Sequence, residues 1–180
     1  MNREKIKRGV STYLPFFILM GAFTESAAMV LEQYKGPIIE ASKIETLSSD
    51  SAVVTTRMRA EKSLEYENGD REYPEGIYIE FYEGDSIAST LTANKAYYYS
   101  KEDLYKGEGN VEIKNYAKEE QLNTEELYLD PKEEKIFTDK FVRVETKGDI
   151  LMGEGITASQ DFSWYKISKP TGVINVKQIE

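Results

Sequence analysis

Residues 91–144 contain a repeated unit of two strands, and this repeat restricts the fold more than any other feature of the chain. Leu91 is followed 31 residues later by Leu122, and Val111 is followed by Val142 at the same distance. Between these anchors, apolar and polar residues alternate with a period of two, which is typical of strands with one buried face. Two anchor pairs with one offset indicate an internal repeat. We therefore expect an all-β protein built from repeated antiparallel strand units.

Each unit carries one irregularity in its alternation. The spacing of the inward-facing residues changes from two to three at Asn94-Lys95 in the first unit and at Glu125-Glu126 in the second. A β-bulge has this effect, because its extra residue bends the strand and redirects its side chains. A weaker step of the same kind occurs at Ala60 and Ala158. The strands are expected to bend and to curl the sheet.

One face of these strands collects apolar side chains. A sheet that curls without covering helices must close over this face, and incomplete closure leaves an apolar groove suited to acyl chains. The residues expected on the inner face are Leu91, Ala93, Val111, Ile113, Leu122, Leu127, Leu129, Val142 and Val144.

The composition disfavours catalysis and nucleic-acid binding. The chain has no His and no Cys, which removes the commonest general base, thiol nucleophiles and the usual ligands of zinc. Its formal net charge is −9, whereas a protein that binds nucleic acid presents clustered Lys and Arg to the phosphates. We expect no enzyme activity, no cofactor and no metal.

Carboxylates remain as candidates for catalysis. Glu108 and Glu154 each lie between two glycines, and carboxyl groups about 5 to 10 Å apart would suit a glycosidase. We favour a structural interpretation, because glycines in such tripeptides allow bulges and positive φ angles. The alternative from another functional class is a carboxylate glycosidase or carbohydrate-binding jelly roll that acts on envelope polysaccharide.

The first 31 residues have the layout of a membrane-targeting segment. Basic residues at positions 3–8 precede an apolar run at positions 10–23. This run suits the apolar part of a signal peptide, with cleavage after Ala28, while its extension through Leu31 would give an uncleaved anchor. Both interpretations place the body of the chain outside the cytoplasm, because basic flanks stay on the cytoplasmic side. We assign residues 1–31 to an anchor or signal segment, 32–51 to a linker and 52–180 to a β-domain.

Four motifs in a fixed order resemble the LptC family of lipopolysaccharide export. They are Ala-Tyr-Tyr-Tyr at 96–99, Gly-Asn-Val at 109–111, Thr-x-x-Leu at 124–127 and Lys-Ile-x-Thr-Asp at 135–139. The resemblance covers about Ile77 to Ile174. It implies a twisted, open β jelly roll of the OstA-like type. Together with the N-terminal segment, the expected architecture is this jelly roll preceded by an N-terminal transmembrane or signal helix.

The resemblance also implies a function and a set of partners. The chain would bind lipopolysaccharide and transfer it from the inner-membrane ABC exporter to a periplasmic bridge protein, as a single-pass inner-membrane protein with its β-domain in the periplasm. Lys106, Lys114, Lys140 and Arg143 would meet the head groups. A soluble, periplasmic OstA-like bridge protein is the alternative within this fold.

Members of the family pass their cargo through strands that pair edge to edge. Transposed to this chain, Val53, Val54 and Met58 would lie on the edge that meets the β-domain of the transporter. The edge that meets the OstA-like bridge protein would contain Val173, Ile174 and Val176.

Overall fold

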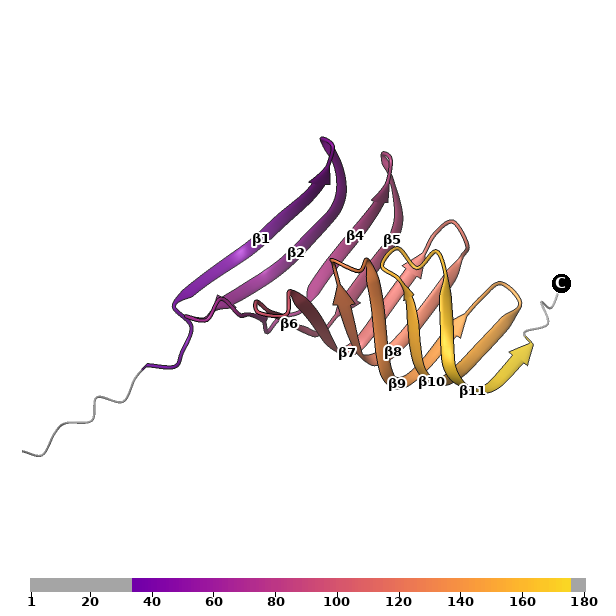
Figure 1. Cartoon of the computed structure of the whole chain (residues 1–180). Helices are drawn as coiled ribbons and strands as arrows, with labels where there is room; N and C mark the ends of the chain where they lie inside the picture. Colours follow the sequence, from indigo (N-terminus) through magenta and orange to yellow (C-terminus); the bar gives the residue numbers. More distant parts are fainter. Residues whose placement is uncertain (1–33, 176–180) are drawn as a thin grey trace, which may run out of the picture. The chain divides into compact units, whose positions relative to one another are not determined.

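The computed structural model describes residues 34–175, and all regular secondary structure within them is β-strand. Eleven strands form one antiparallel sheet (Figure 1). The all-β prediction is confirmed, whereas the predicted helix in residues 1–31 lies outside the described residues. The strands are β1 Ile39–Asp50, β2 Val53–Glu65, β3 Arg71–Tyr73, β4 Ile77–Glu83, β5 Ser86–Ala93, β6 Lys95–Tyr99, β7 Leu104–Asn115, β8 Glu120–Asp130, β9 Lys135–Glu145, β10 Asp149–Ser159 and β11 Tyr165–Asn175.

The sheet follows the order of the chain closely. β3 and β4 both pair with β2, and β5 and β6 both pair with β7, so each couple acts as one long strand with an interruption. From β7 onward each strand pairs with the next. Within the described residues, β1 and β11 each pair with a single neighbour and form the two edges of the sheet.

Irregular positions cross the sheet at the level where the strands bend. Asn94 separates β5 from β6, and the register shifts between Thr124 and Tyr128 in β8, so both predicted bulges are confirmed. The neighbouring strands β7 and β10 carry Gly109 and Gly155, with φ angles of 73° and 76°. The residues on either side of these irregular positions, such as Val111 and Tyr105 of β7, contribute to the same hydrophobic core.

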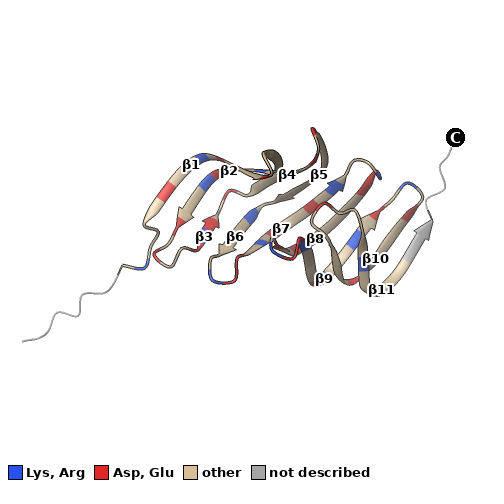
Figure 2. Cartoon of the chain, turned by 45° about the horizontal axis from the view of Figure 1, so that its top comes forward, with Lys and Arg blue, Asp and Glu red and all other residues tan. Residues whose placement is uncertain are grey.

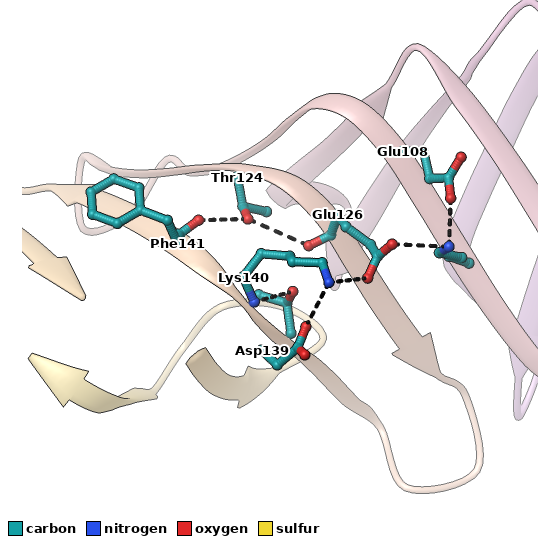
Figure 3. Close-up of polar contacts among 8 residues, drawn as sticks. Glu108, Thr124, Glu126, Asp139, Lys140 and Phe141 are labelled. Carbon is teal, nitrogen blue, oxygen red and sulfur yellow. Dashed lines mark hydrogen bonds and ion pairs between the residues drawn. The ribbon is translucent and has the colours of Figure 1, made fainter. Parts of the chain in front are cut away.

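Two threonines satisfy backbone groups that the bulges leave outside the regular ladder (Figure 3). The Oγ1 of Thr124 donates to the carbonyl of Phe141 over 2.8 Å, and the N–H of Lys140 donates to Oγ1 of Thr138 over 3.1 Å. A hydroxyl can replace a missing ladder bond in this way, which avoids the cost of an unpaired polar group. The weaker step predicted at Ala60 is confirmed, because the buried residues of β2 are spaced by three from Ala60 to Ser63, where β2 changes its partner from β4 to β3. The step predicted at Ala158 is wrong at that residue, because Ala158 pairs regularly with β9 and β11 and the register of β10 shifts between Glu154 and Ile156.

The internal repeat is confirmed by the register of the strands. Leu91 pairs with Ile113, and Leu122 pairs with Val144, each 31 residues later. The other halves of the same strands pair Tyr98 with Tyr105 and Leu129 with Ile136, again with the same offset. The two units are therefore equivalent in backbone pairing on both sides of the bulge.

The inner side chains of both strand halves form one hydrophobic core. Burial of each large apolar side chain contributes roughly 1.5 to 3 kcal/mol to stability. The largest side chains with almost no solvent exposure include Tyr73, Ile113, Leu122, Ile136, Ile156 and Phe162.

Residues 39–50 form β1, although the polar sequence of residues 32–51 predicts a linker. That assignment is wrong for this stretch because β1 pairs with β2 along nearly its whole length. Its side chains are exposed except for Ile44, which is half-buried, so no apolar alternation marks the strand. Ion pairs assist the backbone ladder, among them Glu45 with Arg57 at 3.0 Å and Glu40 with Lys62 at 2.7 Å.

Glu80 anchors a charged cluster on the outer face of β4. Glu80 is only 5% exposed. Both carboxylate oxygens accept from Arg59, at 3.2 and 3.3 Å, and the Tyr82 hydroxyl donates to Oε2 over 2.7 Å. Arg57 lies 3.6 Å from the same oxygen and also contacts Glu45 of β1. The cluster thus links β1, β2 and β4.

Replacing Glu80 with Gln is expected to lower the free energy of unfolding by about 1 to 3 kcal/mol, because the two guanidinium groups lose a buried, hydrogen-bonded counter-ion. Glu133→Gln is the matched control, since Glu133 forms an exposed ion pair with Lys135, and such pairs contribute about 0.5 kcal/mol or less. Urea denaturation measures both changes. Equal effects of the two substitutions would contradict a stabilising role for the cluster.

Within residues 34–175, no helix is long and apolar enough to cross a membrane.

Candidate functional site

The nine residues predicted on the inner face all point into the core. They are between 0% and 8% exposed. Exposure is zero for Val111, Ile113, Leu122, Val142 and Val144, so the interior between β7 and β9 is filled by protein side chains. Towards β2 and β4 the inner residues keep a small exposure, which for Met58 and Leu129 reaches 8%.

A cleft of about 310 Å³ opens between the two strand halves on the β1 side of the sheet. One wall comes from β1, β2 and β4, and the other from the ends of β7 and β8 and the turns that follow β6, β8 and β10. Ligand pockets in proteins typically measure roughly 300 to 1,000 Å³. The cleft is therefore at the lower end of that range, which suits one extended chain better than a bulky group.

The wall of the cleft is apolar at its base and uncharged over most of its mouth. The base is formed by Met58, Ile79, Phe81, Tyr105 and Leu129. Burial is the main cause that raises the pKa of Tyr105 to about 12, so its phenol is neutral at neutral pH. The remaining lining residues at the mouth are Thr46, Ser48, Thr55, Thr56, Asp103, Pro131, Glu134 and Gln160.

The cleft contains only part of the predicted groove. Leu129 lines it, whereas Ala93 lines a separate hollow beside Gly76 that also contains charged residues of β1 and β2. Ile79, Phe81 and Tyr105 were not predicted as groove residues. Ile79 and Phe81 alternate with polar residues along β4, which is typical of inward-facing side chains, but nothing in the sequence indicates that the sheet opens next to them.

One of the two predicted edges is wrong. Met58 pairs with Thr46 of β1 and with Ile79 of β4, so it is central in the sheet and lines the cleft. Val53 and Val54 also pair with β1. The physical reason is β1 itself, which covers β2 and takes its place as the edge.

The opposite edge is β11. Val173 and Ile174 lie in this strand, which pairs with β10 alone among the described residues, while Val176 lies outside them. Pro170 interrupts the row of N–H groups on β11 because proline has no backbone donor. Proline is tolerated in an edge strand for that reason.

The basic residues predicted to meet head groups are engaged with carboxylates. Lys106 binds Glu108 and Glu126, and both carboxylates raise its pKa through hydrogen bonds. Lys140 also contacts Glu126, at 3.6 Å (Figure 3). Lys114 pairs with Glu112 and Arg143 with Glu145. Figure 2 shows the same interspersion of both signs over the strands, so these cations form no concentrated anion site.

Glu108 and Glu154 are not brought together. They lie on β7 and β10, which are separated by β8 and β9, or roughly 14 Å at about 4.8 Å between neighbouring strands. Glu108 pairs with Lys106, and Glu154 lies 3.6 Å from Lys169. The carboxyl pair that a glycosidase would need is therefore not formed by these residues.

Comparison with known families gives one match. The model of a family described as lipopolysaccharide-assembly, LptC-related, matches residues 35–164. No curated protein matches the chain significantly. The matched segment begins before β1 and ends before β11, so it contains both walls of the cleft.

Proposed function

The chain belongs to the family of LptC-related lipopolysaccharide-assembly proteins, and we propose that it binds lipopolysaccharide through the acyl chains and passes it from an inner-membrane ABC exporter to a periplasmic bridge protein. Membership of the family implies involvement in lipopolysaccharide transport.

The apolar cleft between the strand halves is the observation that supports this proposal. An acyl chain seated against Met58, Ile79, Phe81 and Leu129 leaves water, which contributes about 0.8 kcal/mol for each buried methylene group. The sugars and phosphates stay outside the mouth. In the part of the chain that the structure describes, no Lys or Arg lines the cleft, and Lys106 and Lys140 are already paired with Glu126, so the protein would hold the ligand by its apolar part and would need no concentrated positive patch.

The two edges of the sheet are the proposed contacts with partners. β1 would pair with the β-domain of the transporter, and β11 would pair with the OstA-like bridge protein, since an unpaired edge can accept a strand from another chain. This arrangement supports an OstA-like β jelly roll in which the ligand enters near β1 and leaves near β11. Assignment of the transporter contact to β1 replaces the predicted contact through Val53, Val54 and Met58.

The proposed location follows from the N-terminal sequence. Residues 1–31 would anchor the chain in the inner membrane by a single pass and hold the β-domain in the periplasm, because a basic segment precedes an apolar run. The β-domain would comprise residues 52–180 together with β1.

Photo-crosslinking in intact cells tests the cleft. A benzophenone amino acid at Phe81, which lines the cleft, is expected to capture lipopolysaccharide. The same amino acid at Phe137 is the control, because Phe137 is 38% exposed and stacks on Tyr128 away from the cleft. We expect at least tenfold more capture at Phe81. Equal capture at both positions, or capture at Phe137 alone, would overturn the proposal.

A further inference from the structure

The loop between β10 and β11, residues 160–164, starts at the side of the sheet where β10 ends and reaches across to the opposite side. We call these two sides, where the strands begin or end, the rims of the sheet. β7 ends at one rim and β10 ends at the opposite rim, because the strands between them alternate in direction. The Nδ2 of Asn115, the last residue of β7, nevertheless donates to the carbonyls of Asp161 and Phe162, over 3.2 and 3.3 Å. Lys118 in the next turn donates to the carbonyl of Ser163. The two rims therefore touch here, and we call residues 160–164 the latch.

Phe162 extends from the latch into the core. Its side chain has no solvent exposure and stacks on Tyr165, with ring centroids 4.9 Å apart. The core also contains Ile136, Ile156 and Ala158, all almost fully buried. A phenyl ring of the protein thus fills apolar space at the β11 end of the interior, whereas the β1 end is open as the cleft.

The latch holds its shape by local bonds and a strained residue. Ser159 Oγ accepts from the N–H groups of Ser163 and Trp164, and Asp161 Oδ1 also accepts from Ser163. Phe162 has a φ of 57°, a left-handed conformation that a bulky residue adopts at a cost of about 1 to 2 kcal/mol. Such strain persists only where the surroundings enforce it. The bonds that join Asn115 and Lys118 to the latch lie outside the ladder. They can therefore break without unpairing a strand.

We propose that the latch is a gate, in which Phe162 occupies the β11 end of the acyl-binding groove until the latch lifts and a ligand chain takes its place. The inference rests on the proposed function and deepens it. With the latch down, an acyl chain reaches the cleft beside Tyr105 and stops. With the latch lifted, the chain reaches the interior beside Tyr165, next to the edge that faces the bridge protein.

Two matched tyrosines provide the test. Tyr105 lines the open cleft and Tyr165 lies behind the latch, half-buried against the core. A benzophenone amino acid is placed at either position in the full-length protein in cells, and the fraction cross-linked to lipopolysaccharide is measured. In the wild-type background we expect at least tenfold more capture at Tyr105. In Asn115→Ala, we expect capture at Tyr165 to rise at least fivefold while capture at Tyr105 changes by less than twofold.

A second variant of the latch controls for misfolding of Asn115→Ala. Lys118 is exposed, and Lys118→Ala removes only its bond to Ser163, so a smaller rise at Tyr165 is expected in a fully folded protein. Asn123→Ala should leave both signals unchanged, because Asn123 is a half-buried residue of β8 whose side chain bonds to Gln121 and makes no bond to the latch. Capture at Tyr105 together with an unchanged signal at Tyr165 in both latch variants overturns the gate alone, as does equal capture at both sites in the wild type. Absence of capture at Tyr105 in every background overturns the proposed function and the gate with it.

Discussion

Replacing Thr56 with Asp is expected to reduce the capture of lipopolysaccharide in the cleft at least tenfold. Thr56 lines the mouth, is half-buried, and pairs with Phe81 across β2 and β4. A carboxylate at this position would either lose its water when an acyl chain enters or keep the chain out. Desolvation of an unpaired charge costs several kcal/mol, and about 1.4 kcal/mol already corresponds to a tenfold change. The measurement is the cross-linked fraction with the photoreactive residue at Phe81.

Thr56→Val provides the control, because it has nearly the same shape and no charge. Capture should be retained or increased in this variant, since the mouth becomes more apolar. Circular dichroism of both purified variants verifies that the sheet is intact. Undiminished capture in a folded Thr56→Asp variant would show that the acyl chain does not pass this position, and the cleft would lose its proposed role.

Replacing Gly76 with Ala is expected to destabilise the protein by about 3 kcal/mol. Gly76 joins β3 to β4 with a φ of 88°. A Cβ there would lie 2.5 Å from the carbonyl oxygen of Ala93 and 3.2 Å from that of Asn94. Left-handed backbone costs a non-glycine residue roughly 1 to 2 kcal/mol, and overpacking adds about 1 to 3 kcal/mol. Both oxygens belong to the backbone at the bulge between β5 and β6, so they cannot move cheaply.

Gly84→Ala separates these two contributions. Gly84 also has a positive φ, of 60°, but a Cβ would meet no atom within 4 Å. We therefore expect a loss of about 1 kcal/mol for Gly84→Ala from its backbone conformation alone. Urea denaturation with unchanged slopes gives both values. Similar losses for the two variants would mean that the sheet relaxes around the new methyl group and that the bend at Gly76 tolerates side chains.

The strand pairs were predictable because the alternation that defines each strand is contained in the strand's own sequence. Leu91, Leu122, Val111 and Val142 mark the buried face at a constant offset, and the same alternation fixes the register, since a slip of one residue would expose every apolar side chain. The bulges at Asn94 and Glu125-Glu126 were visible for the same reason. A bulge changes the phase of the alternation, and the phase is readable in the sequence.

β1 was not predictable from that pattern. Its side chains are almost all exposed. Because the strand has no buried face, apolar and polar residues do not alternate along it. The strand is held by backbone bonds to β2 and by ion pairs such as Glu45 with Arg57. Which charged residues meet across two strands depends on the register between the strands. The sequence of one strand alone does not specify that register.

The location of the cleft could not be derived from the alternation either. Period two indicates which side chains face inward, and it treats Val144 and Leu129 alike. Whether the facing layer is in contact depends on residues far away in the sequence. Phe162 and Asn115 close one end of the interior, while the other end opens as the cleft beside Met58. Whether an end of the interior is open depends on contacts between residues that are distant in the sequence, so it becomes visible only in the folded structure.

The order of the strands also determines how the protein folds. Nearly all pairings join neighbouring segments, so each new strand closes a short loop and loses little chain entropy. The latch is the exception, because Asn115 meets residues 46 and 47 positions later and needs β8, β9 and β10 in place first. The sheet can therefore form by successive addition of strands, with closure of its β11 end as the final step. We therefore expect the apolar interior to be accessible from both ends until the latch docks onto Asn115.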